Sequence, residues 1–304
     1  MRILFMGTPD FAVASLRRLV EDGHEICGVF TQPDKPKNRG HKLAFSPVKE
    51  YALSQGLTVY QPVKLRDGTA LELIRSLAPE LTVVAAYGRI LPEDILAAPK
   101  LGSINVHSSL LPKYRGAAPI NWAVLNGDAV TGVTIMHMAP ALDAGDIISQ
   151  ASTPIGADET APMLTARLAE LGAELLVSAV EAIGAGTAAR TPQDEAGSTY
   201  APMLSRELSP MDWNKPARTL HDQVRGLLPW PAAVAEFGGI RCKVFSTDIP
   251  LQTTDAAPGT ILEAGKRGID IACGGGTVLH IDELQADGGK RMKAADYLRG
   301  HPLN

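Results

Sequence analysis

The chain has 304 residues, and its length, composition and charge exclude several classes of protein. At about 100–200 residues per domain, it is long enough for two domains with sizeable cores. Hydrophobic residues make up 45% and charged residues 20%, which excludes a disordered or low-complexity chain. A formal net charge of −4 gives no global argument for nucleic acid or acidic lipid, so any polyanionic partner must meet a local patch.

Neither a disulfide framework nor a membrane span is indicated. The cysteines Cys27, Cys242 and Cys273 are odd in number and far apart, so they form no CxxC motif, and no metal site is predicted. The longest apolar run, 81–86, has the length of a strand and falls short of the ~18 residues of a membrane helix. Because residues 1–7 indicate a strand, they leave no room for a signal peptide. We expect a cytoplasmic protein without membrane contact.

The first part of the chain alternates short apolar runs with amphipathic segments. In chain order, we expect strands at 2–6, 26–31, 58–60, 81–86, 103–107, 131–138 and 147–153. Helices are expected between and after them, at 10–22, 47–55, 68–77, 93–97 and 162–183. This alternation predicts an α/β fold with a mostly parallel sheet that helices cover on both faces.

Periodicity fades after this region, where Thr, Pro, Gly and Ser predict a linker. We expect a first domain over 1–190, a linker over 191–208 and a smaller domain over 209–304. The smaller domain combines one expected helix, 217–228, with short strands at 232–237, 240–245, 259–263, 269–272 and 277–284. Short strands separated by glycine pairs predict a small barrel or sandwich.

The segment 103–112, Ser-Ile-Asn-Val-His-Ser-Ser-Leu-Leu-Pro, is the most informative for chemistry. Side chains alternate along a strand, so Asn105 and His107 share one face. They stand at the carboxyl end of a strand, where open α/β sheets place their ligand crevice. An amide and an imidazole can both donate to an oxyanion that develops during acyl transfer. The alternative is a buried polar pair that a neighbouring loop satisfies.

A carboxylate that could orient the imidazole follows the strand expected at 131–138. Asp143 lies in the loop-like sequence Leu-Asp-Ala-Gly-Asp, and from there it could also accept protons through water. The alternative is an aspartate that only stabilises a turn or caps a helix. That alternative describes Asp146 better than Asp143, because Asp146 leads directly into the next strand.

A basic segment lies in the first part of the chain, which is acidic overall. Residues 34–49 contain five Lys or Arg, and Asp34 is the acidic residue among them. The segment joins an expected strand to an expected helix, and it exceeds the usual length of about 2–6 residues for such a connection. A long basic loop can act as a lid or as an arm that contacts phosphates. The alternative is a solvated loop without a partner.

Longer ordered motifs resemble those of a known family. Residues 105–112, 114–120 and 142–145 resemble, in this order, the signature of the 10-formyltetrahydrofolate-dependent formyltransferase family. Further segments match the branch of that family that acts on methionyl-tRNA, namely 7–12, 31–36, 39–40, 46–49, 199–201, 211–213, 228–231 and 289–292. The resemblance covers nearly the whole chain. Two departures are Ala141, where members commonly have Gly, and Lys37-Asn38, where many have small residues.

The resemblance implies a fold and an activity. The fold would be an α/β Rossmann-like formyltransferase domain with a mostly parallel sheet, followed by a smaller OB-like β-barrel domain that helps to bind tRNA. The enzyme would transfer a formyl group from 10-formyltetrahydrofolate, its co-substrate, to the α-amino group of methionyl initiator tRNA for translation initiation. Asn105 and His107 would stabilise the oxyanion, and Asp143 would orient the imidazole and move the proton of the amine. We expect a monomer that uses no metal.

The same resemblance implies binding residues. Folate would contact Tyr87, Gly88, Ile90, Leu91, Ser109, Leu110, Leu111 and Pro112. These segments offer backbone groups for the edge of a pterin and apolar walls for its faces. Binding of tRNA would involve Arg39 and Lys42, then Lys35 and Lys37, and in the second domain Lys290 and Arg291.

Other activities share part of the pattern. Formyltransferases of amino-sugar nucleotides and formyltetrahydrofolate hydrolase have the same Asn-x-His core. The basic segment 34–49 favours tRNA over a nucleotide sugar. A non-catalytic RNA-binding protein with this fold is the alternative from a different class, and the intact Asn105, His107 and Asp143 argue against it.

Overall fold

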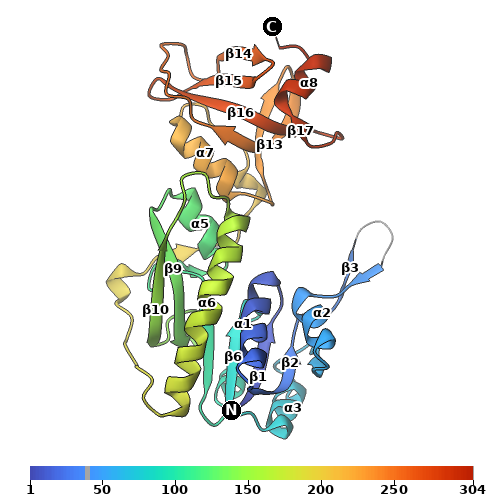
Figure 1. Cartoon of the computed structure of the whole chain (residues 1–304), viewed down its shortest axis with the longest axis vertical. Coiled ribbons are helices and arrows are strands. Elements are labelled where there is room, and N and C mark those ends of the chain that lie inside the picture. The colour runs from blue at the N-terminus through green and yellow to red at the C-terminus, as the bar shows by residue number, and fades with distance from the viewer. Residues whose placement is uncertain (38–41, 304) are drawn as a thin grey trace. The chain divides into compact units, whose positions relative to one another are not determined.

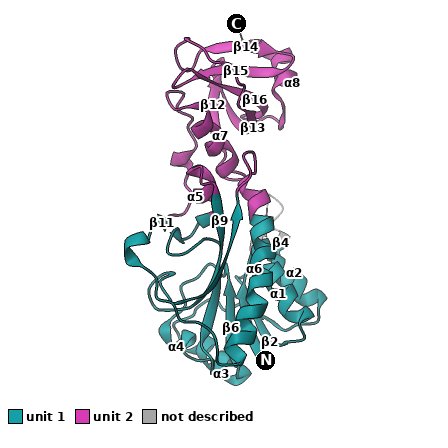
Figure 2. Ribbon diagram, turned by 60° about the vertical axis from the view of Figure 1, so that its left-hand side comes forward, with its two compact units in different colours: residues 1–119, 130–154, 165–201 teal, residues 120–129, 155–164, 202–304 magenta. Residues whose placement is uncertain are grey.

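The computed structural model describes residues 1–37 and 42–303 of the chain (Figure 1). These residues form two compact units, which are coloured separately in Figure 2. The first unit contains residues 1–119, 130–154 and 165–201, and the second contains 120–129, 155–164 and 202–304. Two stretches that precede residue 165 in the sequence therefore group with the C-terminal part of the chain.

A seven-stranded sheet forms the centre of the first unit, in the order β10-β9-β7-β6-β1-β2-β5. Its strands are β1 (Arg2–Gly7), β2 (Glu25–Phe30), β5 (Val59–Tyr60), β6 (Leu81–Ala85), β7 (Ser103–His107), β9 (Val130–His137) and β10 (Ile147–Pro154). Neighbouring strands along the stretch β7-β6-β1-β2-β5 pair in parallel, whereas β9 is antiparallel to both β7 and β10. The prediction of a mostly parallel α/β sheet is confirmed.

Helices cover this sheet on both faces. They are α1 (Asp10–Glu21), α2 (Pro47–Ser54), α3 (Thr69–Leu77), α4 (Glu93–Leu96) and α6 (Ala161–Gly184), whose first turn belongs to the second unit. Figure 1 shows α1 and α6 beside each other in front of the sheet. On the opposite face, Leu4 and Met6 of β1 form one buried cluster with Ile74 of α3 and Ile95 of α4. None of the helices in the described ranges is long and apolar enough to cross a membrane.

Local sequence explains where these elements begin and end. Helix α2 begins at Pro47 because Ser46, in extended conformation, caps it: the Ser46 hydroxyl accepts a hydrogen bond from the Lys49 amide at 3.1 Å. Strand β6 is buried at every position, as expected for a parallel strand with helices on both faces. The elements of the first unit thus follow their apolar patterns.

Several short elements were not predicted. The basic segment contains an antiparallel hairpin of β3 (Lys35–Lys37) and β4 (Lys42–Ala44), with Lys37 opposite Lys42. Strands β8 (Arg115–Gly116) and β11 (Tyr200–Ala201) pair in parallel with each other. Helices α5 (Pro119–Leu125) and α8 (Ala294–Gly300) are short as well. The strands among them have two or three residues and the helices seven, which leaves too few repeats of either period to identify them.

An antiparallel sheet forms the centre of the second unit. Its strands are β12 (Ala233–Phe237), β13 (Ile240–Asp248), β14 (Ile261–Gly265), β15 (Gly268–Cys273), β16 (Thr277–Ala286) and β17 (Met292–Lys293). The order is β12-β13-β16-β15-β14, and β17 also pairs with β16. Val244, Ile271 and Ile281 belong to a core that α8 helps to close, and α7 (Ala217–Gly226) also packs on β13 and β16. The antiparallel sheet fits the predicted short strands, and its closure into an OB-like barrel stays a prediction.

Buried His221 of α7 makes the stability of the second unit depend on pH. Its side chain is 4% exposed, and Nδ1 lies 2.9 Å from the Thr247 hydroxyl. Burial is the main cause that lowers the pKa of His221, and Arg218 and Arg225 act in the same direction against Asp158 and Asp222. The folded protein therefore holds this imidazole neutral at a pH at which the unfolded chain already binds a proton.

We predict that the free energy of unfolding falls as the pH drops below about 6.5, the ordinary pKa of histidine. The reason is that only the unfolded state gains a proton at His221 in that range. His221→Asn keeps a polar group for Thr247 but cannot titrate, so its melting temperature should fall less between pH 7.5 and 5.5 than that of the wild type. Circular dichroism melting curves measure this. Parallel pH dependence in the two proteins would contradict the assignment.

Candidate active site

The candidate site lies at one edge of the parallel sheet. Strands β1, β6 and β7 run in the same direction, with Gly7 opposite Ala85 and Val84 opposite Asn105. Their carboxyl ends therefore meet at a common edge. The segments that follow β6 and β7, residues 86–91 and 108–112, both leave the sheet there. This is the edge at which open α/β sheets bind ligands.

Asn105 and His107 lie on the face of β7 opposite to α6. Gly172 of α6 lies against the intervening Val106, because a Cβ added at Gly172 would be 3.0 Å from the Val106 methyl carbon. Side chains alternate along the strand, so Asn105 and His107 face away from α6. Asn105 is half-buried, and its side chain makes no hydrogen bond to any residue in the described part of the chain. Its amide is therefore available to a ligand.

His107 is held in one tautomer by a backbone group. The imidazole is 6% exposed, and Nε2 donates to the Tyr114 carbonyl oxygen at 3.0 Å. Because a carbonyl oxygen only accepts, Nε2 carries a hydrogen in both charge states of the ring. The other ring nitrogen, Nδ1, lies 3.8 Å from Oδ2 of Asp143. Nδ1 is thus the nitrogen at which this histidine exchanges a proton, and it faces a carboxylate.

Asp143 reaches this position through a tight loop. Its Oδ2 accepts a hydrogen bond from the Gly116 amide at 2.9 Å, and its backbone is left-handed with φ at +48°. Two residues on, a Cβ at Gly145 would lie 1.7 Å from the backbone oxygen of His137. Glycine is therefore required at position 145 for the loop to fold back along β9.

The structure adds residues that sequence reasoning gave no role. Tyr114 and Gly116 contribute backbone groups to His107 and Asp143, although their motif was noted only as part of a resemblance. Gln193 donates from Nε2 to the carbonyl oxygens of Asp143 and Gly145, each at 2.8 Å. It comes from the stretch predicted as a linker, where nothing in the sequence pattern marks it.

The segment after β6 is partly core and partly surface. Tyr87 and Leu91 are buried with the α3–α4 side of the sheet, and burial raises the pKa of Tyr87. Gly88 has a left-handed backbone with φ at +79°, and Gln32 donates to its carbonyl oxygen and to that of Tyr87. Ile90 is 71% exposed. Ile90 and the backbone are therefore what this segment presents to a ligand.

The segment after β7 is fixed by hydrogen bonds to its backbone. The Thr134 hydroxyl donates to the Ser109 carbonyl at 2.7 Å and accepts from the Leu111 amide at 3.1 Å. Gln150 donates to the Leu111 carbonyl at 2.8 Å. The Leu111 side chain is buried, whereas Leu110 and Pro112 are half-buried. These hydrogen bonds fix the backbone of the segment, and Leu110 and Pro112 offer apolar surface.

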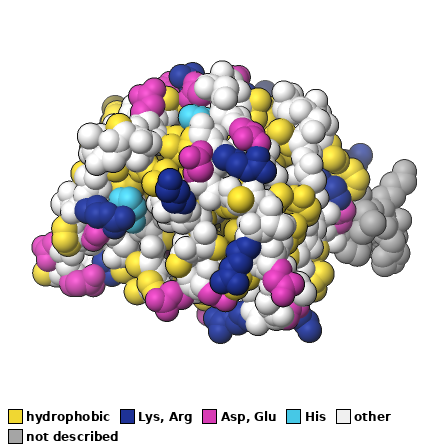
Figure 3. All heavy atoms as spheres, turned by 90° about the horizontal axis from the view of Figure 1, so that it is seen from below, with side chains coloured by type: hydrophobic (Ala, Val, Ile, Leu, Met, Phe, Trp, Pro, Cys, Tyr) yellow, Lys and Arg dark blue, Asp and Glu magenta, His cyan; other side chains and the backbone are white. Residues whose placement is uncertain are grey.

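The cationic residues predicted to bind tRNA in the first unit are only partly described. Arg39 lies outside the described residues, and for Lys35, Lys37 and Lys42 only the backbone of the β3–β4 hairpin is described. Beyond the hairpin, Lys49 is paired with Asp34 at 2.5 Å. Figure 3 shows one face of the molecule, on which Lys and Arg side chains lie among Asp, Glu and hydrophobic groups.

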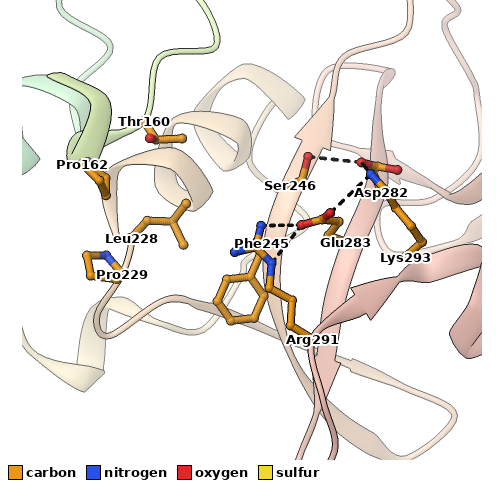
Figure 4. A pocket seen from close by; sticks show the side chains of 10 residues that line it. All are labelled: Thr160, Pro162, Leu228, Pro229, Phe245, Ser246, Asp282, Glu283, Arg291 and Lys293. Carbon is orange, nitrogen blue, oxygen red and sulfur yellow. Dashed lines mark hydrogen bonds and ion pairs between the residues drawn. The ribbon is translucent and has the colours of Figure 1, made fainter.

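In the second unit, the cation cluster near the chain end is matched by carboxylates. Arg291 lies 4.7 Å above the Phe245 ring and pairs with Glu283, while Lys293 pairs with Asp282 at 2.7 Å (Figure 4). Hydrogen bonds from Arg291, more than any other group, hold the pKa of Glu283 below its usual range. These side chains line a cavity of about 480 Å³. Lys290 is exposed.

The chemistry available at the sheet edge combines donors with a carboxylate. Asn105 and His107 present an amide and an imidazole on one face, and Asp143 adds a proton acceptor beside the ring. Among the described residues, no group of three or more His, Cys, Asp or Glu side chains is arranged to hold a metal ion. The amide, the imidazole and the carboxylate together suit the formation and collapse of an oxyanion.

Comparison with known proteins identifies the family. The formyl transferase family profile matches residues 1–180, and that of the formyl transferase C-terminal domain matches 203–302. The chain belongs to the formyl transferase family. Within that family it groups with methionyl-tRNA formyltransferases. The one from Trichlorobacter lovleyi is 48% identical over 99% of this chain and 95% of its own, and the one from Moorella thermoacetica is 49% identical over 100% and 97%.

Solved structures share the fold at lower identity. An N-formyltransferase from Helicobacter canadensis, in complex with folinic acid and dTDP-3-aminofucose, has a TM-score of 0.70 and 20% identity over 92% of this chain and 98% of its own. HypX from Aquifex aeolicus, in complex with tetrahydrofolic acid, has a TM-score of 0.65 and 20% identity over 98% of this chain. This chain spans about half of HypX, 47% of its length. At such identities the likeness shows the fold alone.

We predict that Gly145→Ala lowers the rate of formyl transfer by about 10–100-fold, because the new methyl group cannot coexist with the His137 carbonyl and Asp143 is displaced. A formylation assay at saturating substrate measures this. Gly300→Ala is the control, since a Cβ there meets nothing within 4 Å. If Gly145→Ala keeps wild-type turnover, the loop does not need this conformation.

Proposed function

We propose that this chain transfers the formyl group of 10-formyltetrahydrofolate to the α-amino group of methionine on initiator tRNA. Asn105, His107 and Asp143 perform the chemistry. The observation that carries the proposal is the approach of the Asp143 carboxylate to within 3.8 Å of His107 Nδ1, beside the unengaged Asn105 amide. The names of relatives at 48% and 49% identity, over 99% and 100% of the chain, support formyl transfer to methionyl-tRNA.

The reaction exchanges one carbon–nitrogen bond for another. The amine of the aminoacyl-tRNA attacks the formyl carbon, and the carbonyl electron pair moves to oxygen. The Asn105 amide donates to that oxygen, as does Nδ1 of His107 when it carries a proton, and each such donor is typically worth about 10²–10³ in turnover. When the oxyanion collapses, the bond to N10 of the folate breaks and formylmethionyl-tRNA remains.

Asp143 accepts the proton of the amine and passes it to the folate nitrogen. The attacking nitrogen gains a positive charge and must lose a proton, while the departing folate nitrogen needs one. Oδ2 of Asp143 is held by the Gly116 amide, which leaves Oδ1 for the amine proton. Asp143 then returns this proton to N10, directly or through water.

The folate site lies between the segments after β6 and β7. The folate supplies the activated formyl group on N10. Ile90, Leu110 and Pro112 provide apolar contacts, and backbone groups of Gly88 and Ser109 face the polar edge of the pterin. Tyr87, Leu91 and Leu111 act by keeping these segments in place, because their side chains are buried. An isoleucine as exposed as Ile90 fits a wall that a flat ligand covers.

The tRNA is bound by cations on both units. Arg39 and Lys42, with Lys35 and Lys37, pair with phosphates of the tRNA. Lys290 and Arg291 add contacts from the second unit, and Arg291 exchanges Glu283 for a phosphate when it binds. The enzyme acts as a monomer in the bacterial cytoplasm, where translation begins.

One assay tests this function. Purified protein is given 10-formyltetrahydrofolate together with initiator Met-tRNA, and separately with elongator Met-tRNA, an amino-sugar nucleotide or water alone. Rapid formylation that favours initiator tRNA supports the proposal. Turnover restricted to the sugar nucleotide or to water would keep the chemistry and overturn the acceptor.

We predict that Asn105→Asp lowers turnover by about 10²–10³, because an isosteric carboxylate cannot donate and repels the oxyanion. Since the Asn105 side chain makes no hydrogen bond within the described residues, the melting temperature should stay close to that of the wild type. Filter binding should find unchanged affinity for initiator tRNA. A variant with normal turnover would exclude Asn105 from the oxyanion site.

We predict that Arg39→Ala weakens tRNA binding and reduces by about 1 the slope of log affinity against log salt concentration, because one phosphate contact is lost. Folate affinity should not change. Binding titrations from low to physiological salt measure the slope. Lys100→Ala, an exposed lysine outside the basic segment, serves as the control. Equal slopes for Arg39→Ala and the wild type would remove the hairpin from the tRNA site.

A further inference from the structure

We propose that Gln193 is a positioning residue that holds the Asp143 loop against His107, and that Arg115 fixes the orientation in which Gln193 does so. The inference rests on the proposed function, because it is there that Asp143 receives its role. It assigns a task to a side chain outside the three catalytic residues.

Both hydrogens of the Gln193 side-chain amide are donated to the loop that carries Asp143. Nε2 donates to the carbonyl oxygen of Asp143 and to that of Gly145, each at 2.8 Å. These carbonyls bracket Ala144, so one side chain fixes the backbone on both sides of the turn. A side-chain amide has two N–H donors, and both are used here.

Arg115 determines which way the Gln193 amide points. Oε1 of Gln193 accepts from Nε of Arg115 at 3.0 Å and from Nη2 at 2.8 Å. A reversed amide would direct its NH₂ at the guanidinium, donor against donor. Glu195 holds the outer side of the guanidinium at 2.8 Å, and this hydrogen bond keeps the pKa of Glu195 below its usual range. The amide therefore has one favourable orientation.

The loop requires such a restraint. Asp143 is a non-glycine residue in the left-handed region, with φ at +48°, and Tyr114 across from it has φ at +61°. A side-chain-bearing residue stays in this region only where its surroundings over-determine it. Without the two hydrogen bonds from Gln193, the Gly116 amide would be left to hold the carboxylate in place.

Gln193 and the catalytic pair are linked through three consecutive residues. Tyr114 accepts from His107, Arg115 donates to Gln193, and Gly116 donates to Asp143. Thr199 fixes this segment from the chain that follows Gln193: its carbonyl accepts from the Arg115 amide at 2.9 Å, and its hydroxyl accepts from the Tyr114 amide at 2.8 Å. A shift of Gln193 therefore changes the separation between His107 Nδ1 and the Asp143 carboxylate.

Gln193→Glu tests the proposal with an isosteric change. The carboxylate keeps its partnership with Arg115 but sets an oxygen against the carbonyls of Asp143 and Gly145. We expect kcat to fall by about 10–100-fold, because a displacement of roughly 1 Å can cost 10²-fold. The KM values for folate and for Met-tRNA should change by less than about threefold, since neither binding site is altered. Gln193→Met, which donates nothing and adds no charge, should show the same pattern.

Gln223 in the second unit offers a matched control. Its Nε2 donates to the carbonyl oxygens of Leu208, at 2.8 Å, and of Pro210, at 3.0 Å. Gln223→Glu therefore imposes the same chemical change on backbone carbonyls of the second unit, and Gln223 has no hydrogen bond to Asn105, His107 or Asp143 within the described residues. It should lower the melting temperature about as much as Gln193→Glu and leave kcat unchanged. An equal loss of kcat in both variants would overturn the proposal.

A double-mutant cycle separates positioning from general stability. In an Asp143→Asn background, measured by single turnover with excess enzyme, Gln193→Glu should lower the rate by less than about threefold, because the group it positions is already disabled. The same 10–100-fold loss in both backgrounds would overturn the positioning role. If the wild type is active and Gln193→Glu is equally active, the positioning role of Gln193 is overturned and the proposed function stands. If the wild type formylates no Met-tRNA, both the positioning role and the proposed function are overturned.

Discussion

Backbone hydrogen bonds of the segment Tyr114–Gly116 hold the site together. The Tyr114 carbonyl sets the tautomer of His107, and the Gly116 amide donates to Asp143 at 2.9 Å. Between them, Arg115 fixes the amide of Gln193. Because a backbone group cannot change rotamer, such contacts hold a histidine on a strand and an aspartate on a loop close to each other. Catalysis by charge stabilisation depends on this order, since donors that are already in place need not reorganise during the reaction.

The rest of the first unit keeps that segment rigid. Val106 packs on α6, so Asn105 and His107 must face the other way, toward the loop that carries Asp143. Residues held in the left-handed region, Tyr114 and Asp143, are stable there because hydrogen bonds surround them. Enzymes commonly combine a packed strand with a loop: the strand fixes the position of its side chains, and the loop brings a residue from a distant part of the chain to the site.

In the second unit, a cationic motif of the sequence has part of its charge paired with a carboxylate. Gly-Lys-Arg-Met suggests free positive charge in the sequence, yet Arg291 pairs with Glu283 and stacks on Phe245. Exposed pairs of this kind are weak in water, so a phosphate can compete for the guanidinium. The proposed contact of Arg291 with tRNA therefore requires a phosphate to replace Glu283 at the guanidinium.

The sequence alone determined what depends on near neighbours in the chain. The period of two along residues 103–107 placed Asn105 and His107 on one face, and the alternating apolar runs predicted the parallel sheet. Short elements such as β8 and β11 were not predicted, because a strand of two residues is too short to show a periodic pattern. Only the tertiary structure brought Asp143 to Gly116 across 27 residues, and Gln193 to Asp143 across 50. Spacing in a sequence specifies faces and turns, whereas contacts between distant segments depend on how the packed sheet directs its loops, and no local pattern records that.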